Sequence, residues 1–195
     1  MEYQSMYKVL ANIATQAQEV ATKLDEQLKI NMQRFLGEYL QEENKRIDNE
    51  AKEKLAALQE RAQQLLDDGI AGYQNELDKK YFADIQPNHV GELEMIANSN
   101  LDLAEMRAYF RKFRDNYPAL RRLEKIAEDK GFLVIGKTYM NEMDFLDGVK
   151  NSGQGVVNAI SGGTSTRLTI ALNFMQGKVD GYNQLENKET QVLQK

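Results

Sequence analysis

The sequence predicts an all-α protein in which a long N-terminal helix that forms a coiled coil is followed by a small helical domain. Three observations lead to this prediction. Charged residues make up 28% of the 195 positions, and Gln, Glu, Lys, Ala and Leu dominate residues 1–80, which is typical of long helices. Apolar residues in the N-terminal part recur at steps of three and four. The chain has only two prolines, Pro87 and Pro118, and neither interrupts residues 3–81.

The N-terminal apolar positions form a heptad seam. From Tyr3 to Leu24 the steps alternate between three and four, and up to Tyr39 the local repeat lengthens towards eleven. A helix of this length gains its stability from packing rather than from propensity, so we expect it to self-associate. The pattern leaves the number and direction of the strands open. The predicted oligomerisation seam consists of Met6, Leu10, Ile13, Val20, Leu24, Leu28, Met32 and Phe35.

Two arrangements are open for residues 3–81. The first, which we predict, is one continuous helix on the order of 120 Å long at 1.5 Å per residue. The second is a helical hairpin that turns near residues 67–72, where Gly69 and Gly72 each cost roughly 1 kcal/mol relative to alanine in a helix. Gly37 is a third weak point in the helical pattern.

A linker is predicted over residues 83–92, where Pro87, Asn88 and Gly91 lie close together. The predicted domains are therefore a rod over 1–82, this linker, and a small helical domain over 93–195. Within that domain, Asp102 and Glu105 have the spacing of a capping box that opens a helix from Leu103 to Arg114.

The next helix is predicted to start after Asn116, which caps it, and Pro118 is tolerated in its first turn. It runs to Gly131 and forms a helical hairpin with the helix before it. The apolar letters FLVIG that follow predict a short strand or an extended connector, and a further helix is expected over residues 140–149. Residues 151–166 are rich in Gly and Ser and predict a flexible or partly helical loop. A last helix over 166–179 precedes a polar tail that we expect to be frayed.

Residues 131–138 match the nucleotide-binding pattern G-x-x-x-x-G-K-[ST]. A phosphate-binding loop needs residues between its glycines that can wrap around phosphate, whereas Phe132 to Ile135 are all bulky and apolar. Gly131 also follows a helix, where its expected role is the left-handed residue that ends the helix. We interpret the match as a helix end and an apolar connector, and retain a P-loop NTPase as a third hypothesis.

No catalytic constellation is visible elsewhere in the sequence. The chain has no cysteine and a single histidine, His89, so a histidine-based triad, a thiolate metal site and a multi-histidine metal site are not available. We therefore predict a protein that is not an enzyme and that uses neither a cofactor nor a metal.

The chain carries a net charge of −5, yet the segment from Arg107 to Lys125 is strongly basic. Three interpretations are open for this segment. Tyr109, Phe110 and Phe113 lie between the arginines, which is typical of a nucleic-acid surface if the rings are exposed. Alternatively, the rings pack inside the helical hairpin beneath the arginine stems, or the basic face docks on an acidic helix of another subunit. The acidity of the whole chain disfavours nucleic acid. The candidate docking residues are Arg107, Arg111, Lys112, Arg114, Arg121, Arg122 and Lys125.

Residues 101–132 resemble a segment of small structural or assembly proteins of tailed bacteriophages and prophages of Gram-positive bacteria. The resemblance rests on a short helix followed by an Asn-Pro-x-x-Leu-Arg-x-Leu segment and by a helix that ends in Ala-x-x-x-Gly; in this chain Tyr117 stands between Asn116 and Pro118. The matching positions are Asn116, Pro118, Leu120, Arg121, Leu123, Ala127 and Gly131. It implies a component of virion assembly without enzymatic activity, whose partners are other copies of the chain and other particle proteins.

The expected function is therefore that of a non-enzymatic structural protein. It self-associates through its N-terminal helix and docks partners through the basic hairpin; the alternative is a nucleic-acid-binding adaptor that uses the same face. The N-terminus lacks the pattern of a signal peptide, and no apolar run approaches the ~20 residues that span a bilayer. We expect the protein in the cytoplasm of a bacterial host or in the virion, not exported by a cleaved signal and without a membrane partner.

Overall fold

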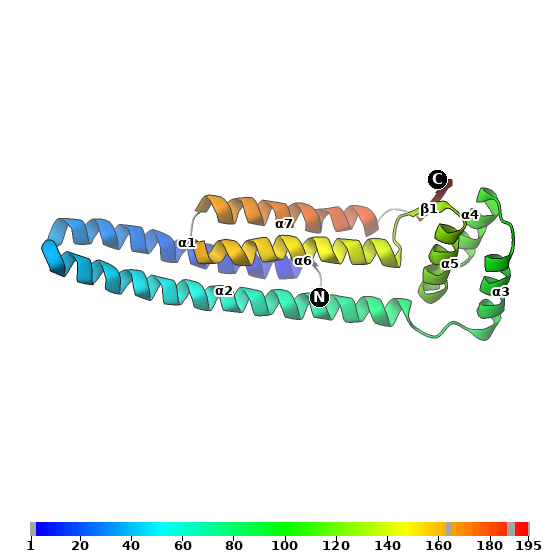
Figure 1. The fold of residues 1–195 in the computed structure, drawn as a ribbon, viewed down its shortest axis with the longest axis horizontal. Helices are drawn as coiled ribbons and strands as arrows, with labels where there is room; N and C mark the ends of the chain where they lie inside the picture. Colours follow the sequence, from blue (N-terminus) through cyan, green and yellow to red (C-terminus); the bar gives the residue numbers. More distant parts are fainter. Residues whose placement is uncertain (1–2, 163–164, 187–189, 195) are drawn as a thin grey trace. The chain divides into compact units, whose positions relative to one another are not determined.

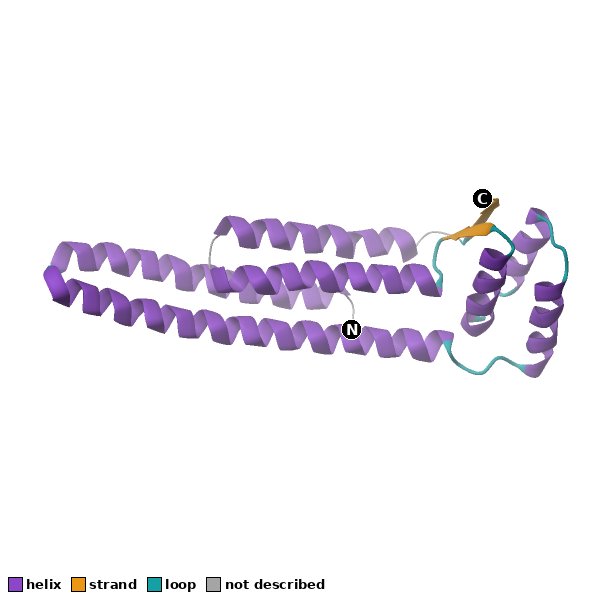
Figure 2. Ribbon diagram, in the orientation of Figure 1, coloured by secondary structure: helices purple, strands orange, loops and turns teal. Residues whose placement is uncertain are grey.

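The computed structural model of the chain describes residues 3–162, 165–186 and 190–194, and it confirms the all-α prediction (Figures 1 and 2). Seven helices and two short strands are present in the described residues. In chain order they are α1 (Tyr3–Arg34), α2 (Gly37–Tyr81), α3 (Pro87–Asn98), α4 (Leu103–Lys112), α5 (Tyr117–Asp129), β1 (Phe132–Ile135), α6 (Tyr139–Gly162), α7 (Ser165–Glu186) and β2 (Gln191–Gln194).

The chain forms two compact units whose limits differ from the predicted domains. Unit 1 combines Met1–Ala71 with Gly148–Asp180, and unit 2 combines Gly72–Asp147 with Gly181–Lys195. The predicted division placed residues 148–180 with the C-terminal domain. Residues 148–180 belong to unit 1 because this part of α6 and α7 buries its apolar side chains in that unit. The buried side chains include those of Val156, Ile160, Leu168 and Met175. The predicted linker over 83–92 is helical from Pro87 onwards.

The N-terminal segment is a helical hairpin, so the prediction of one continuous helix is wrong. The alternative of a hairpin is confirmed, but its turn lies at Phe35 and Leu36 rather than near residues 67–72. Gly37 has a φ of 60°, a left-handed value that favours glycine, and it opens α2. Gly69 serves packing instead, since a Cβ at this position would lie 2.6 Å from Met6 Sδ.

Unit 1 is built from two helical hairpins, α1 with α2 and α6 with α7. Met6 lies against Gly69, and Asn31 Nδ2 donates to Asn44 Oδ1 at 2.9 Å, so α1 and α2 are antiparallel neighbours. Gln154 Nε2 donates to Gln63 Oε1 at 2.8 Å, which joins α6 to α2. The Tyr7 hydroxyl donates to Gln176 Oε1 at 3.1 Å and joins α1 to α7. Met6, Leu10 and Ile13 of the predicted oligomerisation seam are therefore buried within their own chain.

The predicted Gly/Ser loop over 151–166 is also wrong. Residues 151–162 complete α6 and residues 165–166 begin α7, while residues 163 and 164 lie outside the described residues. A Cβ on Gly153 would lie 2.6 Å from Leu66 Cδ1, so a small residue in this segment permits close packing of α6 on α2. Gly153 therefore serves helix packing rather than chain flexibility.

Unit 2 contains a small helical domain and a two-stranded sheet. β1 pairs with β2 in antiparallel register, with Phe132 opposite Gln194 and Ile135 opposite Gln191. The tail predicted to be frayed thus forms a strand at residues 191–194, where Val192 is buried; residues 187–189 and 195 lie outside the described residues. The apolar core of this unit includes Leu93, Ile96, Met106, Phe110, Phe113, Leu120, Leu123, Phe132 and Val192.

The helix ends of unit 2 confirm the local predictions. Asp102 and Glu105 form the capping box at the start of α4, with Glu105 N donating to Asp102 Oδ1 at 2.8 Å. The Asn116 side chain accepts from Ala119 N at the start of α5. Gly131, with a φ of 80°, follows the end of that helix. No helix in the described part of the chain combines the length and apolar character needed to cross a membrane.

Candidate functional site

The basic face lies on α4, α5 and the turn between them, all in unit 2. Phe110 and Phe113 are buried in the apolar core, and Tyr109 is half-buried against it. The packing interpretation of the aromatic residues is thereby confirmed, because the two phenylalanine rings point inward while the arginines cover the outside. These three rings do not provide an exposed row on which bases could stack.

Four of the seven predicted docking residues are engaged with neighbouring groups. Arg107 Nε donates to Val192 O of β2 at 2.9 Å, and Lys112 forms an ion pair with Glu92 of α3. Both contacts are made within the fold of unit 2. Arg114 pairs with its neighbour Asp115 at 3.2 Å. Lys125 Nζ lies 3.1 Å from Asp129 and 3.2 Å from Glu128, and these carboxylates raise the pKa of Lys125.

The other three, Arg111, Arg121 and Arg122, make no ion pair with the described residues, and their side chains are exposed. Arg121 is nevertheless fixed in place. Its guanidinium carbon lies 3.7 Å from the centre of the Phe82 ring and 5.5 Å from that of Tyr139, both within cation–π range. A cation held in this way keeps its hydrogen-bond donors available to a partner.

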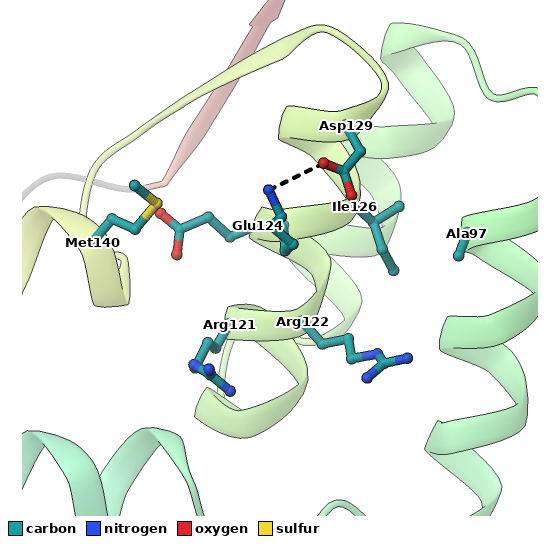
Figure 3. Close-up of a pocket in the computed structure, with 8 residues that line it drawn as sticks. Ala97, Arg121, Arg122, Glu124, Ile126, Asp129 and Met140 are labelled. Carbon is teal, nitrogen blue, oxygen red and sulfur yellow. Dashed lines mark ion pairs between the residues drawn. The ribbon is translucent and has the colours of Figure 1, made fainter.

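A hollow of about 490 Å³ opens beside these arginines (Figure 3). Ala97 of α3, Ile126 of α5 and Met140 of α6 give it an apolar lining, and Arg121 and Arg122 project at one end of it. The ion pair of Lys125 with Asp129 lies at the other end. Phe82 and Met140 are each 51% exposed, which adds apolar surface beside the cations. The complete lining is Ala97, Arg121, Arg122, Glu124, Lys125, Ile126, Asp129 and Met140.

Glu124 forms the buried wall of this hollow. Burial raises the pKa of its carboxyl group, whereas hydrogen bonds with the Thr138 hydroxyl and with the backbone of Met140 and Tyr139 act in the opposite direction. The carboxyl therefore takes up a proton more readily than a solvated glutamate does. Its partners lie at the N-terminal end of α6, so Glu124 ties α5 to the start of that helix.

The residues of the nucleotide-binding pattern form a strand between two turns. Residues 132–135 are β1, whose backbone groups pair with β2. Thr138 accepts from Asn141 N at 3.2 Å and caps α6, and Lys137 Nζ lies 3.9 Å from a carboxylate oxygen of Glu142. The segment is thus extended and hydrogen-bonded where a phosphate-binding loop would wrap around its ligand.

A buried polar cluster around Glu142 was not predicted from the sequence. Glu142 is 1% exposed, and both of its carboxylate oxygens accept from Lys80 Nζ at 3.2 Å. The Tyr182 hydroxyl lies 3.4 Å from one of these oxygens. Burial and the Glu142 carboxylate raise the pKa of Tyr81. Since α2, α6 and α7 supply these residues, no local sequence signal could have brought them together; the cluster links the three helix ends within unit 2.

His89, the one histidine, contacts Asn116, with 3.0 Å between His89 Nδ1 and Asn116 Nδ2. Among the residues that the structure describes, no three His, Cys, Asp or Glu side chains are placed to hold a metal ion. No protein-family model, curated protein or solved structure matches this chain.

Proposed function

We propose that the chain is a non-enzymatic structural protein that self-associates through its N-terminal hairpin and docks an acidic partner segment on the basic surface of α5. The hollow beside Arg121 and Arg122 carries the proposal. It combines exposed guanidinium groups that have no acidic partner in the described structure with an apolar lining. An amphipathic helix with acidic residues at its edge matches both features.

Repeated docking would make such a surface effective in an assembly. Contacts with a single hollow of this size give modest affinity, whereas several copies held together raise the effective concentration of the partner. A role in building a particle, as the resemblance to phage structural proteins implies, is the setting that we propose for it.

The docking test uses the full chain and a fluorescein-labelled amphipathic peptide of Leu, Ala and Glu as the probe. Arg121→Glu with Arg122→Glu should weaken binding by more than about tenfold, because the peptide then meets like charge. The matched control is Arg61→Glu with Lys150→Glu. It makes the same change in net charge at exposed residues of unit 1, so it should leave affinity nearly unchanged at physiological salt.

Three results would overturn this proposal. Equal losses in the two double variants would show that only net charge matters. Tight binding of single-stranded or duplex DNA that weakens steeply with salt, without binding of the peptide, would favour the nucleic-acid adaptor instead. Binding of ATP that is lost in Lys137→Ala would favour the NTPase.

A further inference from the structure

The α1/α2 hairpin extends beyond the helices that cover it. In unit 1, Leu66 lies beside Gly153 and Gln63 beside Gln154, so the end of α6 at Gly162 falls at about the level of residue 57 of α2. Two contacts fix the antiparallel register of α1 on α2: Met6 lies against Gly69, and Asn31 is hydrogen-bonded to Asn44. In this register residue 18 of α1 lies opposite residue 57 of α2. We call residues 18–57 the arm, and residues 3–17 with 58–71 the base. In Figure 1 the parts of α6 and α7 that belong to unit 1 lie beside the base, and the arm extends past their ends.

Burial differs sharply between the two parts. The base buries most of its seam, whereas Asn31 and Ala51 are the only buried residues among 18–57. Val20, Leu24 and Leu28 of the same seam are half-buried. At the tip of the arm, Met32 is 60% exposed, Leu36 86% and Tyr39 59%. Two helices alone do not cover this seam.

A hollow of about 210 Å³ lies along the arm between its two helices. Val20 and Leu24 of α1 line one side, and Ile47 and Ala51 of α2 line the other. Steps of three and four connect Ala17, which is fully buried in the base, to Val20 and Leu24. The hollow therefore continues the seam on which the base packs.

We propose that a second copy of the chain covers this hollow, with its arm antiparallel to the first. This inference rests on the proposed self-association and gives it a location. Each level of the paired arms then contains four helices, as the base already does with α6 and α7. The tip residues of each arm reach the base of the other and lose their exposure. Because both copies use the same surface, the interface is two-fold symmetric and closed.

Charge and area are both compatible with a second copy. The arm carries nine acidic and seven basic residues, so two arms are not strongly repelled. Its α1 part is roughly 25 Å long at 1.5 Å per residue and its face is two helices, or about 20 Å, wide. Covering roughly 500 Å² of this face on each copy gives about 1,000 Å² in total, the lower end of a specific interface.

The location of the interface can be tested by disulfide formation, because the chain has no cysteine. Gln27 lines the hollow near the middle of the arm, where the two-fold axis would bring it close to Gln27 of the second copy. Gln27→Cys should form a cross-linked dimer under mild oxidation, at least tenfold faster than Asp25→Cys. Asp25 is the matched control because it is exposed at nearly the same level on another face of α1. Equal rates for the two variants would overturn the proposal.

Sedimentation velocity of the full chain separates this inference from the proposed function. The unaltered chain and Phe174→Glu, which changes an exposed apolar residue of α7, should both sediment as dimers. Leu24→Glu should sediment as a monomer with unchanged helical circular dichroism. A dimer that persists in Leu24→Glu but is lost in Phe174→Glu would overturn the arm interface and leave self-association standing. A monomeric unaltered chain at 100 μM would overturn both.

Discussion

The base and the arm of the α1/α2 hairpin follow one heptad pattern but reach different degrees of burial. Leu10 in the base is fully buried, whereas Leu24, two heptads later in the arm, is half-buried. The two residues have the same type and the same heptad position, so the difference comes from α6 and α7, which pack on the base. A heptad pattern thus indicates which face of a helix packs, but not how many helices cover it.

The largest effect that this comparison predicts comes from truncating one leucine in each part. Leu10→Ala should lower the free energy of unfolding by about 2–5 kcal/mol, because it removes fully buried methyl groups and leaves a cavity. Leu24→Ala should cost about 1 kcal/mol at low protein concentration, since its side chain is already partly in water. Urea denaturation followed by circular dichroism measures both values.

Repeating the two unfolding measurements at several protein concentrations shows whether a second copy covers Leu24. The cost of Leu24→Ala should rise with concentration if a second arm covers it, while the cost of Leu10→Ala should rise much less. Equal costs for the two variants at low concentration would contradict the difference in coverage.

A smaller effect, opposite in sign for two neighbouring glycines, is expected in α6. Gly153→Ala should destabilise the protein by about 1–3 kcal/mol, because the new Cβ overpacks against Leu66 of the base. A Cβ on Gly155 would meet no neighbouring side chain within 4 Å, so Gly155→Ala should gain about 0.5–1 kcal/mol from helix propensity. Thermal or urea unfolding of the two variants provides the test, and destabilisation by both would show that close packing is not specific to Gly153.

The smallest effect concerns the position of the turn that defines the arm. Gly37→Ala should cost about 1 kcal/mol, since Gly37 has a left-handed φ that alanine adopts with strain. Gly72→Ala should instead add about 0.5–1 kcal/mol, because Gly72 lies inside α2 with open space around it. The same unfolding measurements apply. A reversal of these signs would place the turn near residues 67–72 and remove the arm.

The basic surface shows a similar division between local and long-range information. The sequence predicts that Arg121 and Arg122 lie on the outside of a helical hairpin, because Leu120 and Leu123 mark its inner face. It does not predict that Ala97 and Met140 complete the hollow, since α3 and α6 bring these residues to α5 through tertiary packing. The burial of Glu124 follows from the same packing.

Helix ends were the most predictable features of the fold. The capping box of Asp102 and Glu105 is made by residues three positions apart. The Asn116 cap and the left-handed Gly131 are equally local. Strand β2 was missed because its polar tail sequence becomes a strand only when Val192 pairs with β1, which lies far earlier in the chain.

The all-α class, the apolar face of the N-terminal helices and the helix caps are all readable from the sequence, because each depends on residues within a few positions of one another. Three other features emerge only from tertiary packing: Gly37 opens the second helix of a hairpin, α6 and α7 cover the base, and the arm remains uncovered. Burial depends on which distant helices arrive at a face. Equivalent leucines in the base and the arm carry no signal that distinguishes these outcomes.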